Sequence, residues 1–232
     1  GTGANNTYIG SQAGLGATGN SNSSNVAVGK DALLSITTGG ANVAIGANTA
    51  DALLAGANNV FIGQAAGAST TDVDKAVIIG AGAGDANMTS AADGTVAIGY
   101  TAGAALTSGD GNVAVGNSAA NAITTGAKNV AIGQNALLLG TDTDDNTCLG
   151  YQAGYSIAHS SSGDGQNICI GSSAGLWATT IKRSIFIGHE AGKGITGTRL
   201  TGDGNTTVGY QAGLLLQGAA ATNCLVGTFA GG

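Results

Sequence analysis

The chain has no proline and few charged or aromatic residues. Of its 232 residues, 9% are charged, 4% are aromatic and 43 are glycine. Glycine is also abundant in collagen, but collagen places it at every third position and this chain has no such period. Valine and isoleucine recur at regular intervals, which argues against a disordered chain. The composition therefore excludes collagen and disfavours disorder.

Basic clusters and long apolar runs are also missing. The chain carries 7 Lys and Arg against 13 Asp and Glu, and its only adjacent basic pair is Lys182-Arg183. Nucleic-acid binding needs a positively charged surface, and a membrane-spanning helix needs about 20 consecutive apolar residues. We therefore predict no nucleic-acid partner and no membrane insertion.

Cysteine is scarce, with Cys148, Cys169 and Cys224 only. An odd number without a Cys-x-x-Cys pair argues against a disulfide framework and against a zinc site. Cys148 and Cys169 occupy the same position of adjacent repeats, whereas Cys224 stands one place earlier in its repeat and should face the other way. We interpret them as small apolar residues and predict no cofactor.

A short motif recurs along the whole chain, and Asn129-Val130-Ala131-Ile132-Gly133 is its clearest copy. It consists of Asn, three mostly apolar residues, Gly, two variable residues and Ala, and its commonest spacing is 17 residues. A short, steady period of this kind is typical of a solenoid, in which each unit contacts its neighbours. The central glycines of the thirteen copies are Gly10, Gly29, Gly46, Gly63, Gly80, Gly99, Gly116, Gly133, Gly150, Gly171, Gly188, Gly209 and Gly227.

Each repeat is too short for two helices and a turn. Its apolar run is rich in Val and Ile and ends at Gly, which indicates a β-strand. The sequence thus predicts an all-β fold, a parallel β-solenoid of about 13 coils. With coils ~4.8 Å apart, the rod would be about 60 Å long. We predict one continuous array over residues 1–232, as a fragment of a longer fibre protein.

The positions within the repeat predict which side chains face the core. The residue before each central Gly is always aliphatic, and the residue two places earlier is mostly so; because strand side chains alternate, we assign both to the core. A second core column comprises Ile36, Leu53, Leu106, Ile123, Ile157, Ile195 and Leu216.

The middle residue of each triplet should then point outward, yet it is rarely polar. A strand that is apolar on both faces is buried on both faces, and a contiguous apolar stripe marks an interface. The alternative is a mildly apolar surface, since Ala is tolerated there. We predict a symmetric homo-oligomer whose interface comprises Ala27, Ala44, Phe61, Ile78, Ala97, Ala114, Ala131, Cys148, Cys169, Phe186 and Leu225.

The Asn-Val-Ala-Ile-Gly-x-x-Ala unit resembles the head repeats of trimeric autotransporter adhesins, the YadA-like β-roll, and equally the repeats of bacteriophage tail fibres. The resemblance covers residues 6–231. It implies a homotrimer that is extracellular, on a virion tail fibre or a bacterial surface, and that attaches to a cell-surface glycan or protein receptor. Neither family motif carries catalytic residues, so the resemblance implies no enzyme.

Aromatic residues supply candidate ligand contacts. Tyr100, Tyr151 and Tyr210 share the solvent-facing position after the central Gly, and Trp177 lies beyond the tenth repeat. Exposed rings with polar neighbours suit sugar stacking; the alternative is packing along the solenoid. The insertions between about residues 155 and 204 interrupt the repeat, and loops on a rigid scaffold often carry binding.

Three acidic residues, Asp142, Asp144 and Asp145, suggest a weak Ca²⁺ site with oxygen ligands. They match no known calcium loop, and solvated turn residues are the alternative, so we assign no metal. Two other functions stay open. One is a purely structural extracellular filament subunit; the other is an ice-binding solenoid, which requires a regular Thr column, and no column is consistently Thr.

Overall fold

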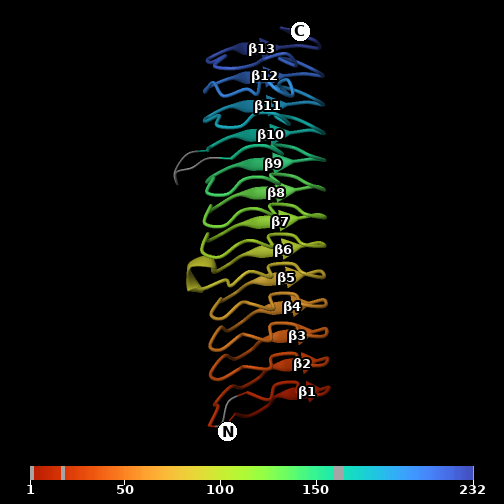
Figure 1. Cartoon of the computed structure of the whole chain (residues 1–232), viewed down its shortest axis with the longest axis vertical. Coiled ribbons are helices and arrows are strands. Elements are labelled where there is room, and N and C mark those ends of the chain that lie inside the picture. The colour runs from red at the N-terminus through yellow and green to blue at the C-terminus, as the bar shows by residue number, and fades with distance from the viewer. Residues whose placement is uncertain (1–2, 17–18, 159–164, 232) are drawn as a thin grey trace. The chain divides into compact units, whose positions relative to one another are not determined.

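The structure, a computed structural model, describes residues 3–16, 19–158 and 165–231. The fold is a parallel β-solenoid, as predicted (Figure 1). Thirteen strands of three residues each form one sheet in sequence order. They are β1 (Thr7–Ile9), β2 (Val26–Val28), β3 (Val43–Ile45), β4 (Val60–Ile62), β5 (Val77–Ile79), β6 (Val96–Ile98), β7 (Val113–Val115), β8 (Val130–Ile132), β9 (Thr147–Leu149), β10 (Ile168–Ile170), β11 (Ile185–Ile187), β12 (Thr206–Val208) and β13 (Cys224–Val226), with one 3-10 turn, η1 (Ser90–Ala92).

The chain divides into two compact units. Unit 1 covers residues 1–112 and contains β1–β6; unit 2 covers residues 113–232 and contains β7–β13. Both units are built from the same coil, and neighbouring strands pair in parallel with equivalent residues in register, such as Val60 with Val77 in unit 1 and Val130 with Thr147 in unit 2.

The central glycines allow the coils to approach each other closely. Gly63 has a φ of 129°, and a Cβ added there would lie 2.7 Å from the carbonyl carbon and oxygen of Gly80 in the next coil. In unit 2, a Cβ at Gly171 would lie 2.5 Å from the Gly188 oxygen. No side chain fits at either distance, which explains why the repeat has Gly at this position.

Buried asparagines connect the coils through their side chains. The Asn42 amide donates to Gly56 O at 2.8 Å, and its Oδ1 accepts from the backbone N of Asn59 at 3.0 Å. In unit 2, Asn146 and Asn167 repeat the arrangement, because Asn146 Oδ1 accepts from the backbone N of Asn167 at 3.2 Å and also from its Nδ2 at 2.9 Å. Each of these four asparagines is at most 1% exposed. The Asn that opens most copies of the motif therefore satisfies backbone groups inside the solenoid; Ala76, Thr95 and Ser184 replace it in three copies.

The structure corrects the predicted orientation of the strands. The middle residues lie in the core rather than on the surface, so the interface predicted at these positions is wrong. Leu225, in the last strand, is half-buried, and the other ten are at most 2% exposed: Ala27, Ala44, Phe61, Ile78, Ala97, Ala114, Ala131, Cys148, Cys169 and Phe186.

The physical reason is that the coil is narrow. The middle residue faces the position six residues later in the same coil, and the two side chains share one small volume. A Cβ added at Gly67 would lie 2.5 Å from the Phe61 ring, and one at Gly154 would lie 2.5 Å from the Cys148 sulfur. Where the middle residue is Ala131, the opposing residue is instead Leu137, fully buried. Small and large residues thus alternate across the core.

The second predicted core column is largely confirmed. Ile36, Leu53, Leu106, Ile123 and Ile157 are at most 1% exposed. Ile195 and Leu216, which follow the later and less regular strands, are half-buried. The columns on either side of the middle residue, which the sequence assigned to the core, point outward instead and form the surface described next.

Candidate functional site

The first and third residues of each strand form an apolar surface that we name the outer strand face. In unit 1, Val60 and Ile62 of β4 are half-buried, and Ile45 of β3 is 39% exposed. In unit 2, Leu149 is 43% exposed and Ile187 is 37% exposed. The positions without an aliphatic side chain are Thr7, Thr147, Thr206 and Cys224.

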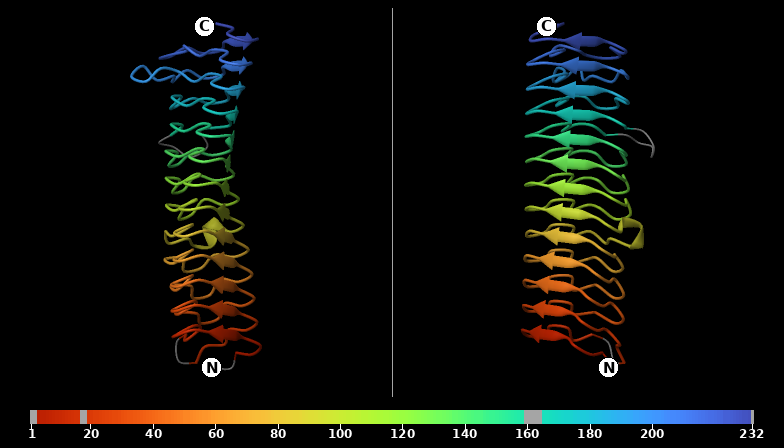
Figure 2. Two further views of the ribbon diagram at one scale, coloured as in Figure 1. Left: turned by 90° about the vertical axis from the view of Figure 1, so that its right-hand side faces the viewer. Right: turned by 180° about the vertical axis from the view of Figure 1, so that it is seen from behind.

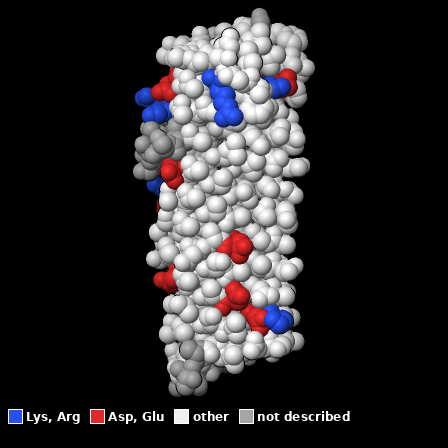
Figure 3. Space-filling model, viewed as in Figure 1, with Lys and Arg blue, Asp and Glu red and all other residues white. Residues whose placement is uncertain are grey.

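The outer strand face lacks charge in all thirteen described strands. Charged residues elsewhere are sparse, and the space-filling view shows large areas without any (Figure 3). An uncharged, aliphatic, partly exposed sheet face in each unit is unusual for a surface that meets only water. This surface fits contact with another apolar surface.

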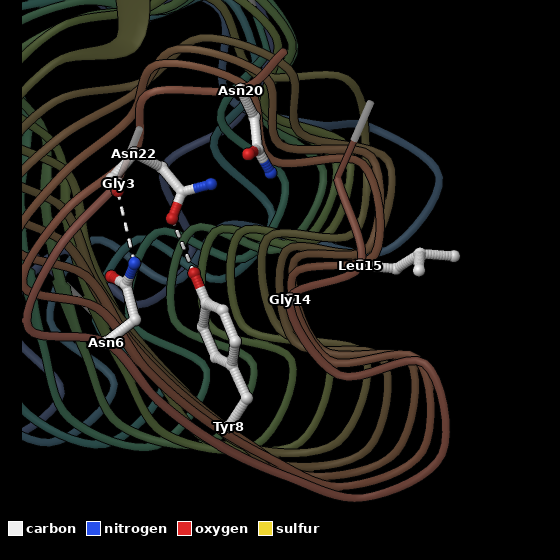
Figure 4. Close-up of a pocket in the computed structure, with 7 residues that line it drawn as sticks. All are labelled: Gly3, Asn6, Tyr8, Gly14, Leu15, Asn20 and Asn22. Carbon is white, nitrogen blue, oxygen red and sulfur yellow. Dashed lines mark hydrogen bonds between the residues drawn. The ribbon is translucent and has the colours of Figure 1, made fainter. Parts of the chain in front are cut away.

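A small polar pocket lies at the first coil (Figure 4). The Tyr8 hydroxyl donates to Asn22 Oδ1 at 2.5 Å, and Asn6 Nδ2 donates to Asn22 O at 3.1 Å. Burial raises the pKa of Tyr8, and a hydrogen bond with Asn25 partly opposes the rise. The pocket has a volume of about 240 Å³ and is lined by Gly3, Asn6, Tyr8, Gly14, Leu15, Asn20 and Asn22. Tyr8 occupies here the core position that residues such as Ala27 and Phe61 occupy in later coils.

The predicted tyrosine column is exposed. Tyr100 in unit 1 is 61% exposed, and Tyr151 and Tyr210 in unit 2 are 48% and 47% exposed. Tyr210 stacks on His189 with ring centroids 5.3 Å apart and also meets Phe229 edge-on at 5.4 Å. The ladder packing that we considered for this column is therefore present at Tyr210, which makes its ring faces less available to a ligand.

An ion pair lies beside the stacked rings. The Glu190 carboxylate accepts hydrogen bonds from Lys193 Nζ at 2.5 Å and from Gln211 Nε2 at 2.6 Å. The bond from Lys193, followed by that from Gln211, lowers the pKa of Glu190 below its usual value of 4.5. The carboxylate thus connects the turn after β11 to the turn after β12.

Glu190→Gln should make the stability of unit 2 less dependent on acid pH. Because folding lowers the pKa of Glu190, the ionised carboxylate stabilises the folded state fully above pH 4.5. This stabilisation is lost as the pH falls through the lowered pKa. Between about pH 7 and about pH 3, the melting temperature measured by circular dichroism should fall less steeply for the variant than for the wild type. Parallel curves for wild type and Glu190→Gln would contradict the prediction.

Trp177 belongs to a separate cluster in unit 2. Its ring meets Tyr155 at a centroid distance of 6.2 Å and an interplanar angle of 68°. The guanidinium carbon of Arg199 lies 5.9 Å from the centre of the indole ring. Three successive turns, after β9, β10 and β11, each supply one residue. Trp177 was predicted as a contact residue; Tyr155 and Arg199 were not, because they occupy irregular positions next to insertions.

The acidic residues proposed for calcium hold backbone and hydroxyl groups of the preceding coil. Asp142 Oδ1 accepts from Thr124 Oγ1 at 3.0 Å and from Thr125 Oγ1 at 2.7 Å. Asp144 Oδ1 accepts from Ala127 N at 2.7 Å, and Asp145 is exposed. Within the described ranges, no group of three or more His, Cys, Asp or Glu side chains is placed to hold a metal ion.

A column of threonines, which the sequence analysis did not recognise, lies eight residues after many central glycines. Thr37 Oγ1 donates to Leu54 O at 2.7 Å, and Thr179 Oγ1 donates to Leu200 O at 3.4 Å. Leu54, Met88, Ala158 and Gln217 interrupt the column. The hydroxyls therefore help to join coils, and the regular Thr array required for ice binding is not continuous.

Cys148 and Cys169 pair in register as free, buried thiols, and Cys224 is exposed. The repeat correctly placed Cys224 on the opposite face from the other two, but the prediction of which face is buried was wrong. Of the insertion after Tyr155, residues 159–164 lie outside the described part of the chain. Among the residues that are described, no helix has the length and apolar character needed to cross a membrane.

The chain matches no known protein family model, no curated protein and no solved structure.

Proposed function

We propose that this chain is a structural and adhesive fibre segment that associates with identical copies and mediates attachment to a cell surface. The outer strand face carries the proposal. Uncharged aliphatic residues recur on it at every strand of unit 1 and unit 2, and burial against another protein surface would remove their exposed area from water.

A further copy of the chain is the partner that fits this face. The outer strand face repeats at the strand spacing of a parallel sheet, ~4.8 Å. A partner surface that packs between the side chains of the outer strand face along many strands needs the same strand spacing. Another copy of this solenoid has that spacing. A closed symmetric assembly then buries the face of each chain, and a trimer is the form that the resemblance to adhesin heads and tail fibres suggests.

The proposed attachment to a cell surface rests on the difference between the strands and the turns of each coil. The strands are short and uniform, whereas the turns vary in length and carry the exposed aromatic and charged side chains. A stiff array with variable turns can present a ligand-binding surface away from the self-association face. On this proposal the chain has no catalytic role and acts outside the cell, on a virion tail fibre or a bacterial surface.

Placing lysines on the outer strand face should abolish self-association without unfolding the chain. We expect the wild type to behave as an elongated trimer in light scattering and sedimentation. Ile132→Lys combined with Ile170→Lys should give monomers, because an unpaired charge buried in an apolar contact costs several kcal/mol. The matched control, Asn117→Lys with Gln134→Lys, adds the same charge at exposed positions and should remain trimeric.

Two results would contradict self-association through this face: a monomeric wild type at all concentrations, or lysine variants of the face that assemble as well as the control. Attachment is tested separately with fluorescently labelled trimer on bacterial cells. A trimer that binds no cell but assembles end to end would identify a purely structural filament subunit instead.

A further inference from the structure

The contacts around Trp177 place an aromatic surface next to a positive charge. Trp177 is the only tryptophan of the chain. It is half-buried, as is Tyr155, while Arg199 is exposed. With the Arg199 guanidinium carbon 5.9 Å from the indole centre, the cation is held over the ring. An arginine held in this way keeps its planar fork of N–H donors ordered for a bidentate acceptor.

The backbone fixes the positions of these side chains. Trp177 N donates to Lys193 O at 2.8 Å, and Thr179 N donates to Leu200 O at 2.9 Å. Ala178 and Leu200 form a parallel bridge on the same two coils. Arg199 therefore directly precedes a residue that is hydrogen-bonded to the coil of Trp177, which limits the movement of its backbone.

A small hairpin carries Arg199. Ile195 and Thr198 form an antiparallel bridge between β11 and β12, where the repeat is 21 rather than 17 residues long. In the left view of Figure 2 this light-blue segment extends beyond the neighbouring coils of unit 2. The insertion thus carries Arg199, whose guanidinium carbon lies 5.9 Å from the Trp177 ring centre.

The charge around the hairpin is opposite to that of the whole chain. The net charge is −6, yet four of the seven Lys and Arg residues fall between residues 182 and 199, where Glu190 is the only acid. Lys and Arg accordingly gather toward the upper end of the view in Figure 3. An anionic ligand would be repelled by most of this acidic protein, so a local excess of positive charge favours its binding here.

We propose that Tyr155, Trp177 and Arg199 form a binding site for a saccharide that carries a carboxylate. The apolar C–H face of a pyranose ring packs on the aromatic side chains, and the carboxylate accepts paired hydrogen bonds from the Arg199 guanidinium. This inference rests on the proposed attachment function and names the chemistry of its ligand. Uronic acids and sialic acids share this chemistry.

Binding to the full chain can be measured by isothermal titration with sialyllactose, trigalacturonate and neutral lactose. At least one of the two carboxylated sugars should bind, and lactose should bind at least about tenfold more weakly. Arg199→Gln should weaken binding about tenfold or more, because a hydrogen bond to a charged group is lost. Lys128→Gln, an equal loss of charge at an exposed position of unit 2 outside residues 182–199, should change the affinity less than about twofold.

The contribution of the ring is tested with Trp177→Ala, which should weaken binding about tenfold, and with Trp177→Phe, which keeps a ring and should retain most of the affinity. Binding of sialyllactose alone identifies a sialic acid ligand, and binding of trigalacturonate alone identifies a uronate. The proposed site is contradicted if neither acid binds, if lactose binds equally well, or if Lys128→Gln weakens binding as much as Arg199→Gln does.

Light scattering on the same samples separates this inference from the proposed function. A trimer that attaches to cells but binds neither acid overturns the saccharide site alone. A monomer that binds a carboxylated sugar through Arg199 overturns the fibre assembly and leaves the site in place.

Discussion

Replacing Gly63 by alanine should prevent the coils of unit 1 from stacking and lower the stability of the unit by roughly 4 kcal/mol or more. Two costs add. A φ of 129° is a conformation that residues with a side chain rarely adopt, and the new Cβ would lie 2.7 Å from the Gly80 carbonyl. Both obstacles are backbone atoms, which cannot move aside without breaking the pairing of β4 with β5. Thermal unfolding followed by circular dichroism measures the effect.

Gly94→Ala is the matched control, because it makes the same chemical change in the same unit. Gly94 has a φ of 73°, and its added Cβ would meet nothing within 4 Å. Only the backbone preference for glycine is lost there, roughly 1 kcal/mol. If the two variants melt at the same temperature, close stacking at the central glycine does not limit the fold.

Phe61→Ala should destabilise unit 1 by about 3 to 5 kcal/mol, and a second substitution, Gly67→Leu, should restore most of that loss. Phe61 is fully buried, so its truncation leaves a cavity. Gly67→Leu alone should also destabilise, by about 1 to 3 kcal/mol, because its side chain would enter the volume of the Phe61 ring. Together the two changes recreate a pairing that the chain already uses.

That pairing is present where Ala27 faces Leu33 in unit 1. Leu33 is fully buried and has a φ of 51°, close to the 61° of Gly67, so leucine is tolerated in this backbone conformation. The double variant should unfold within about 2 kcal/mol of the wild type. Additive losses, measured by urea unfolding of the two single variants and the double variant, would show that the opposing positions do not share one volume.

The fold could be predicted from the sequence because the central glycine recurs with a steady spacing and the strands carry β-branched residues. Their orientation could not, because a three-residue strand such as Val130-Ala131-Ile132 offers only one alternation and is apolar on both faces. The usual assumption that large aliphatic residues face inward fails here, since the narrow coil admits Ala131 and places Val130 and Ile132 outside.

One sequence signal does contain the correct orientation. Phe61 precedes Gly67 by six residues, and Ala131 precedes Leu137 by the same interval, so bulk at one position accompanies its absence at the other. A large residue at one position paired with a small residue at the other is expected only when the two side chains contact each other. The Arg199 site carries no comparable signal, because the insertion that positions it breaks the 17-residue spacing and only the stacked coils show where its side chain lies.

The opposing residues of a coil fit each other mainly within a single repeat, although the Phe186 ring also approaches Gly175 of the preceding coil. The hydrogen bonds that join coils are made mostly by backbone groups and by the recurring asparagine. A repeat with a small middle residue can therefore be duplicated, deleted or exchanged as a whole with little steric conflict in its neighbours. We expect this gene segment to change length by recombination in whole repeats, which would alter the reach of the protein while the chemistry of each turn is inherited intact.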